Sequence, residues 1–260
     1  MDDQDAEIES IMTQVVEHIK ALRQQIADTK VPEDQVWFRN FLFGILNCAL
    51  TDYKSVQIGV KKLVALAAWG CRNLLELKVI TENLLRSEQD AIGLQNALTL
   101  DAREFYEAMS RSHTATFKQY LGLLSELANQ EQGPMKAALV EKLRSDSKLG
   151  PQTAETDAEA EGFRQFQLSM GLEANAKPKM VNAMLRTDYE KDEFYPLNKI
   201  CSKLVHRTVL SIASTNVEGS LDAIVPFLEN SATTILLQIY DRIKRYVDAA
   251  GIVIPPKHAL

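Results

Sequence analysis

One helical-looking segment carries the residue types whose spacing most suggests chemistry. In it, His206 follows Ser202 by one helical turn, while Lys199, Lys203 and Arg207 recur at four-residue spacing. Neighbouring cations disfavour the charged form of a histidine, which leaves a neutral imidazole able to accept a proton near pH 7. A cationic ridge beside such a base would hold a phosphodiester and stabilise developing negative charge. The pattern predicts His206 as a general base and the other four residues as substrate-binding groups.

An ordinary solvated helix face is the competing interpretation of this segment, because rows of lysines are common on protein surfaces. However, Ser202 and His206 share a stripe with Tyr195, Val209 and Ala213, so their side of the helix is only half polar. Such a side is expected to face a partner helix or a cleft. Tyr195 therefore joins the predicted substrate-binding residues.

A second polar group interrupts the most apolar helix that the sequence predicts. Arg72 and Glu76 lie one turn apart and point the same way, within a stripe of apolar residues. Burying both charges is costly unless they are paired and hydrogen-bonded. They form either an i,i+4 ion pair that fixes register or lies at the bundle edge, or part of a polar site between facing helices. The second interpretation makes them catalytic residues that converge with His206.

The positions of the apolar residues predict an all-α multi-helix bundle. Apolar residues recur at three- and four-residue spacing almost everywhere, and no Asn-Gly or Asp-Gly hairpin pair occurs. Helices are expected over about 5–28, from Pro32 onward, 55–86, 101–129, 193–214 and 220–249, the third of these being central. Asp101 and Glu104 resemble a capping box, and Pro226 should kink the last helix or mark a fresh start.

The chain is predicted to form one helical bundle domain over residues 1–260. Residues 145–178 are polar and acidic and are punctuated by Gly150 and Pro151, which predicts an exposed, weakly structured connection with short helices. The helices on either side look too apolar to stand alone.

Composition excludes several classes of function. A net charge of -6 argues against holding nucleic acid by bulk electrostatics, although a local basic patch remains compatible with it. The three cysteines lack zinc or disulfide spacing, so we expect reduced core residues. No histidine pair has metal-ligand spacing, and glycine-rich nucleotide motifs and hydrolase motifs are absent, so neither metal nor cofactor is predicted. An acidic N-terminus and the lack of long apolar runs predict a cytoplasmic protein with no membrane association.

Two segments resemble a large uncharacterised family of helical bacterial proteins. They are "RNLLELKVI" (72–80) and "KPKMVNAMLRTDYEKDEFYPLNKICSKLVHRTVLSI" (177–212). Members pair an arginine/glutamate helix with a downstream helix that carries tyrosine, serine and a Val-His pair. The matching positions here are Arg72, Glu76, Tyr189, Tyr195, Ser202 and His206.

That family is in turn similar to the HEPN superfamily of helical domains, which includes metal-independent ribonucleases of toxin and phage-defence systems. The resemblance implies a HEPN-like bundle in outline. HEPN catalytic helices place an arginine four to six residues before the histidine. Here the positions four to seven before His206 hold Ser202, Cys201, Ile200 and Lys199. Lys199 or Arg72 would have to take the arginine's place.

Three hypotheses follow for function. The first is an RNA-directed cytoplasmic stress or phage-defence factor acting as a metal-independent endoribonuclease. The second is a non-enzymatic helical interaction module in which Arg72 and Glu76 form a structural ion pair and the N-terminal helix mediates homodimerisation. The third is a bundle that binds a small nucleotide. The expected partners are thus RNA or a nucleotide and a second copy of the chain.

Overall fold

The computed structural model describes residues 3–130, 149–177, 180–205 and 224–255. Within these ranges the regular structure is helical and no strand occurs. The predicted all-α multi-helix architecture is therefore confirmed. His206 and Arg207 lie outside the described residues.

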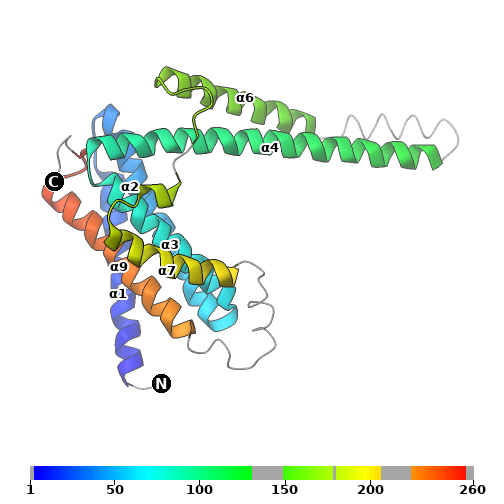
Figure 1. Ribbon diagram of the computed structural model, residues 1–260. Helices are drawn as coiled ribbons and strands as arrows, with labels where there is room; N and C mark the ends of the chain where they lie inside the picture. Colours follow the sequence, from blue (N-terminus) through cyan, green and yellow to red (C-terminus); the bar gives the residue numbers. More distant parts are fainter. Residues whose placement is uncertain (1–2, 131–148, 178–179, 206–223, 256–260) are drawn as a thin grey trace. The chain divides into compact units, whose positions relative to one another are not determined.

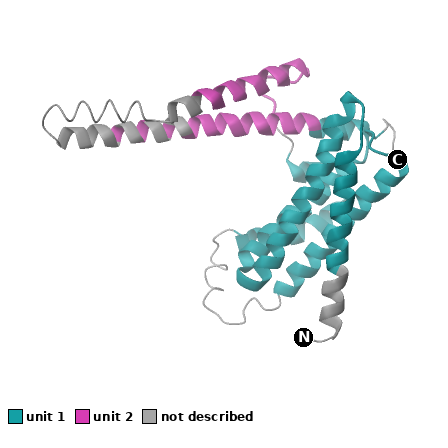
Figure 2. Ribbon diagram, turned by 180° about the vertical axis from the view of Figure 1, so that it is seen from behind, with its two compact units in different colours: residues 1–94, 179–260 teal, residues 95–178 magenta. Residues whose placement is uncertain are grey.

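The chain divides into two compact units, where the sequence predicts a single domain (Figure 2). One unit comprises residues 1–94 and 179–260, and the other comprises residues 95–178. The second unit is therefore an insertion between the third and later helices of the first. The described parts of the two motif segments, residues 72–80 and 180–205, belong to the first unit, apart from Lys177.

Long helices that lie wholly within the first unit make up most of its described part (Figure 1). They are α1 (Asp3–Asp28), α2 (Val36–Lys62), α3 (Val64–Leu84), α7 (Asp188–Val205) and α9 (Ile224–Ala250), with short 3-10 turns η1 (Glu33–Gln35) and η2 (Val181–Met184). Helix α3 packs against α2, α7 and α9, so the helix expected to be central is central. Pro226 lies in the first turn of α9, where its missing amide costs nothing.

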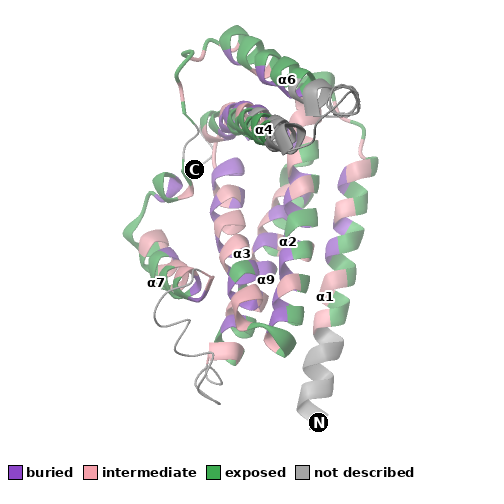
Figure 3. Cartoon of the chain, turned by 90° about the vertical axis from the view of Figure 1, so that its right-hand side faces the viewer, coloured by how far each residue is buried: buried purple, intermediate pink, exposed green. Residues whose placement is uncertain are grey.

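The core of this unit lies where α2, α3 and α9 turn their buried sides toward one another (Figure 3). On α2 the fully buried side chains recur every four residues, at Phe38, Leu42 and Leu46. This spacing places them on one face of the helix. Leu74 on α3 and Ile239 on α9 are also fully buried.

Helices α2 and α3 form a tight hairpin that breaks at Leu63. This residue is extended, with φ -157° and ψ 101°, although the sequence predicts continuous helix from residue 55 onward. Two glycines allow the two helices to pack closely on either side of this break, because each lies against the backbone of the other helix. A Cβ on Gly59 would lie 2.2 Å from the amide nitrogen of Ala67, and one on Gly70 would lie 2.6 Å from the carbonyl oxygen of Asp52. The two helices can approach this closely only where side chains are absent.

Asp52 is a buried carboxyl between these two helices. Burial raises its pKa, and the hydrogen bond from Asn73 Nδ2 to Asp52 Oδ1 (3.1 Å) only partly opposes that rise. The folded protein therefore binds a proton at Asp52 more readily than the unfolded chain does, and stability decreases as pH rises through the raised pKa.

We expect Asp52→Asn to raise the thermal stability at pH 7, because an amide keeps the acceptor for Asn73 without the buried charge. The gain should disappear below the ordinary aspartate pKa of about 3.9. Thermal unfolding of both proteins from pH 3 to pH 7 tests this, with Asp192→Asn, at an exposed position on α7, as the control. An unchanged or lower melting temperature at pH 7 would contradict it.

Two helix starts differ from the predicted ones because other capping boxes are used. Helix α4 (Glu88–Gln130) begins after Ser87, whose hydroxyl accepts a hydrogen bond from the Asp90 amide (3.2 Å) and donates one to the Asp90 carboxylate (3.0 Å). The predicted box at Asp101 and Glu104 is therefore wrong, since both residues lie inside α4. Helix α7 likewise begins near Thr187, ahead of the predicted start at residue 193, and contains Pro196.

The second unit contains α4 from residue 95 onward and α6 (Leu149–Ser169). In this unit the segment expected to be weakly structured holds a continuous 21-residue helix. Its buried residues Thr156, Ala160 and Gln167 share one side, and Phe163 stacks on Tyr106 of α4 at 5.6 Å between ring centroids. The other sides of α6 are rich in acidic residues. The segment therefore looks polar in the sequence, and its narrow buried stripe is hard to recognise.

Candidate functional site

The two motif-bearing helices are antiparallel neighbours. Along α3, Lys78 pairs with Glu193, and Arg86, just beyond the helix, pairs with Glu190. The partners on α7 thus fall in number as those on α3 rise. This contact brings the arginine/glutamate segment beside the tyrosine/serine segment.

Arg72 and Glu76 form an ion pair within α3. The Nε of Arg72 donates to Oε1 of Glu76 over 3.1 Å, and the two side chains are 32% and 31% exposed. The pair therefore lies at the edge of the bundle and has not been buried in the core. The neighbouring Cys71 thiol and, to a smaller extent, the positive charge of Arg72 lower the pKa of Cys201 on α7. Arg72 is accordingly close to the residue that precedes Ser202.

The predicted substrate-binding residues on α7 divide between two environments. Ser202 is half-buried, whereas Tyr195, Lys199 and Lys203 are exposed and lie on the side of α7 that faces away from α3. Phe194, Cys201 and Leu204 are buried on the opposite side. We call Tyr195, Lys199 and Lys203 the α7 outer face.

The structure therefore brings together only part of the predicted site. Arg72 and Glu76 are paired, and Arg72 is near Cys201, but the α7 outer face points elsewhere. Convergence of His206 with Arg72, and the place of Arg207, lie outside the described residues.

Further charged contacts between α3 and α7 were not predicted. Lys78 Nζ lies 2.5 Å from Glu193 Oε1, and Arg86 Nη2 lies 3.0 Å from Glu190 Oε1. A cavity of about 30 Å³ lies between these helices and is lined by both ion pairs. It has room for one or two water molecules and is far too small for a nucleotide.

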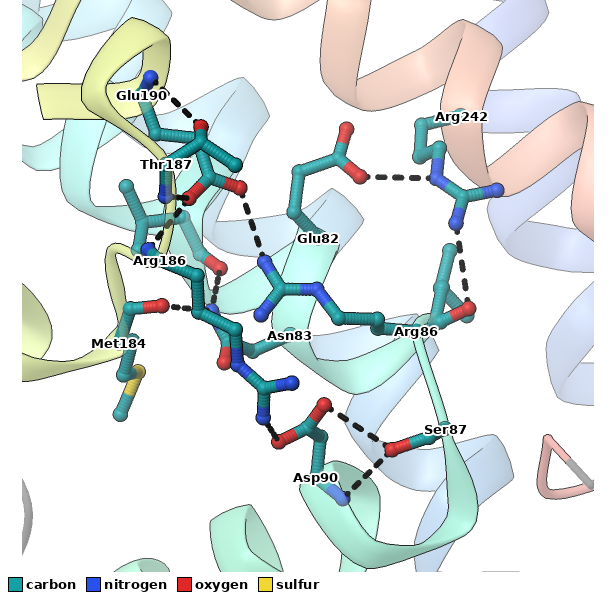
Figure 4. A network of polar contacts seen from close by, with 12 residues as sticks. Glu82, Asn83, Arg86, Ser87, Asp90, Met184, Arg186, Thr187, Glu190 and Arg242 are labelled. Atoms are coloured by element: carbon teal, nitrogen blue, oxygen red, sulfur yellow. Dashed lines mark hydrogen bonds and ion pairs between the residues drawn. The ribbon is translucent and has the colours of Figure 1, made fainter. Parts of the chain in front are cut away.

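Glu190 is the centre of a polar network at the end of α3 (Figure 4). Its carboxylate accepts hydrogen bonds from the backbone amides of Arg186 (2.6 Å) and Thr187 (2.9 Å) and from Arg86, while the Thr187 hydroxyl accepts from the Glu190 amide (3.1 Å). Burial alone would raise the pKa of Glu190, but these donors together outweigh burial and lower it. The network caps α7 and fixes it to α3.

The same network ties in α4 and α9. Arg186 pairs with Asp90 of α4, and Arg242 of α9 donates to Glu82 Oε2 (3.0 Å) and to the carbonyl oxygen of Leu85 (3.2 Å). A capping-box signal was available in the sequence for Thr187 and Glu190, three residues apart. Nothing in the sequence identified their long-range partners.

The cysteines differ from one another in environment. Cys71 and Cys201 are fully buried, as expected of core residues, but Cys48 is exposed, so the expectation of a core position is wrong there. Cys48 lies on the outer side of α2, whose buried stripe passes through Leu46 and Ala49.

Comparison with known proteins does not assign this chain to a family. No protein-family profile, curated protein or solved structure matches this chain. Over the described ranges, no three His, Cys, Asp or Glu side chains gather as metal ligands. None of the helices in those ranges has the length and apolar character needed to span a membrane.

Proposed function

We propose that this protein is an RNA-directed helical module that binds single-stranded RNA through the α7 outer face. The observation that carries the proposal is the combination of an exposed tyrosine with two exposed lysines on one side of a helix whose other side is fixed to α3. Single-stranded nucleic acid is bound by aromatic rings that stack on bases and by cations that follow the phosphates.

The tyrosine of this face is suited to stacking. Tyr195 is 46% exposed, and its ring packs edge-on against Phe194 with 5.7 Å between centroids. Because Phe194 is buried, this contact restrains the tyrosine ring while leaving part of it open to a base. Unpaired bases offer such a face, whereas bases in a duplex are already stacked.

Two lysines follow the tyrosine along the exposed side of α7. Lys199 and Lys203 are one turn apart, which is a spacing that lets both reach one backbone. With few phosphate contacts, affinity should be modest and should fall as salt rises. In this proposal Arg72 and Glu76 serve as a structural ion pair, since their charges neutralise each other at the edge of α3.

We expect the double substitution Lys199→Glu and Lys203→Glu to lower the affinity for a single-stranded RNA oligonucleotide by about tenfold or more, because two attractive charges become repulsive. Fluorescence anisotropy at two salt concentrations measures this. Lys54→Glu with Lys61→Glu, at exposed positions on α2, makes the same change of net charge and serves as control. Equal losses in both variants would show a non-specific charge effect and contradict the proposal.

A second candidate function is cleavage of the bound RNA without a metal. The observation that favours it is the position of Arg72 close to Cys201, which brings a cation of one motif helix beside the other motif helix. In such a reaction His206 would accept the proton of the 2′-hydroxyl as its oxygen attacks the neighbouring phosphorus, and Arg72 would stabilise the charge that develops. The bond from phosphorus to the 5′-oxygen would break, so that one product carries a 2′,3′-cyclic phosphate and the other a 5′-hydroxyl that takes its proton from water.

For this candidate we expect the wild-type protein to cleave total RNA and tRNA in EDTA, and His206→Ala to lose that cleavage while its melting temperature is unchanged. A DNA oligonucleotide, which lacks the 2′-hydroxyl, should stay intact. If both proteins bind RNA but neither cleaves it, the ribonuclease hypothesis is contradicted and the binding hypothesis stands.

A further inference from the structure

Helix α4 carries a stripe of exposed residues along the side that α6 leaves open. On its covered side, Tyr106 stacks on Phe163 of α6, and Arg103 donates a hydrogen bond to Gln167 (2.6 Å). The exposed stripe recurs in alternating steps of three and four positions, at Leu98, Asp101, Phe105, Ala108, Ser112 and Ala115. Such steps keep residues on one side of a helix and form the seam through which two helices pack. We call these six residues the α4 seam.

The α4 seam has large apolar side chains toward its start and small ones toward its end. Leu98 and Phe105 are 52% and 60% exposed, whereas the apolar positions that follow are Ala108 and Ala115. One exposed apolar residue is ordinary on a protein surface. A graded seam, however, fits a helix that runs in the opposite direction and carries the same gradient.

We propose that the α4 seam is the interface through which two copies of this chain associate, with their α4 helices antiparallel about a two-fold axis. Such an interface is self-complementary, because each contact from the first copy to the second is repeated from the second to the first. Placing Phe105 over Ala108 of the second copy fixes every other pair, since one step forward along one helix is one step back along the other.

The remaining pairs of the seam are complementary in this register. Leu98 falls opposite Ala115 of the second copy, so a large side chain again meets a small one. Asp101 falls opposite Ser112 of the second copy, whose hydroxyl can donate a hydrogen bond to the carboxylate. A polar layer of this kind lowers the affinity but specifies the register of the two helices.

The charges on one flank of the seam favour the antiparallel direction. Glu104 and Arg111 are exposed on that flank, and the same register places Glu104 beside Arg111 of the second copy. Within one chain, Glu104 lies 3.9 Å from Arg103, and Arg111 lies 3.8 Å from Glu107 with 83% of its side chain exposed. These contacts are too long for hydrogen bonds. Parallel helices would instead bring the two Asp101 carboxylates together, where they would repel each other.

The dimer is expected to be weak, because the seam covers fewer than three heptads and a stable coiled coil usually needs three or four. The inference is independent of RNA binding, since the α4 seam lies wholly in the second unit and the α7 outer face lies in the first. It also places the contact between copies on α4, where the sequence predicts it on the N-terminal helix.

Sedimentation velocity of the full-length protein, over roughly a hundredfold range of concentration, tests the association. We expect the wild-type sedimentation coefficient to rise with concentration toward that of a dimer. Phe105→Glu should hold it at the monomer value, whereas Phe166→Glu, at an exposed position on α6, should leave the dimer intact. A wild-type protein that stays monomeric throughout, or a dimer that survives Phe105→Glu, would overturn the proposal.

An exchange of charges tests the antiparallel register. Glu104→Arg and Arg111→Glu should each weaken the dimer by about tenfold, because two attractive pairs become repulsive at the two-fold axis. The double variant restores both pairs and should recover most of the wild-type affinity. Additive losses in the double variant would overturn the register and with it the proposed interface.

Discussion

Gly59→Ala and Gly70→Ala are each expected to lower the free energy of unfolding by about 2–4 kcal/mol, the cost of overpacking a closely fitted contact. A methyl group at Gly59 would meet the backbone of Ala67 at 2.2 Å, and one at Gly70 would meet the carbonyl oxygen of Asp52 at 2.6 Å. Backbone atoms cannot rotate away as a side chain can, so α2 and α3 would have to separate.

Gly44→Ala is the matched control, because Gly44 lies in the same α2 helix and a Cβ there has no atom within 4 Å. It is expected to stabilise the protein by about 0.5–1 kcal/mol, since alanine favours the helix interior. Urea denaturation of the three variants and the wild type measures all four values. If Gly59→Ala were as stable as Gly44→Ala, the helices would not approach as described.

The second large effect is expected at Glu190. Glu190→Ala should cost about 3 kcal/mol, because it removes a helix cap and leaves the mostly buried Arg86 without its partner. Arg86 and Glu190 are only 22% and 29% exposed, so solvent screens their attraction less than it does for surface pairs. Tyr189→Ala, at the neighbouring position that is 76% exposed, is the control and should change stability little.

The network at Glu190 also predicts a dependence on pH. Its pKa is lowered in the folded protein, so its contribution to stability is fully present above the ordinary glutamate pKa of about 4.3 and is lost as pH falls through the folded value. The stability difference between wild type and Glu190→Gln should therefore shrink below pH 4. A difference that is constant from pH 7 to pH 3 would show that Glu190 acts without its charge.

Local patterns predicted the fold class and the central position of α3, because apolar spacing depends only on neighbours along one helix. The break at Leu63 could not be found in this way, since no glycine or proline marks it. It follows from the tertiary contact of Gly59 with Ala67. Helix α6 was missed for a related reason, because its buried stripe is narrow and packs against α4.

The same division applies to the candidate site. The pairing of Arg72 with Glu76 follows from their i,i+4 spacing, and the exposed lysines of α7 follow from their shared side of a helix. The pairs of Lys78 with Glu193 and of Arg86 with Glu190 join residues more than 100 positions apart. Such partners depend on how helices pack, which a single sequence does not specify.

The most direct test of the RNA-directed function is photo-crosslinking of the native protein to a single-stranded RNA oligonucleotide that contains 4-thiouridine, followed by tryptic digestion and mass spectrometry. The crosslink is expected on the peptide 192–199, which contains Tyr195 and ends at Lys199. Crosslinks only in α2, α4 or α9, or none at a saturating RNA concentration, would contradict binding through the α7 outer face.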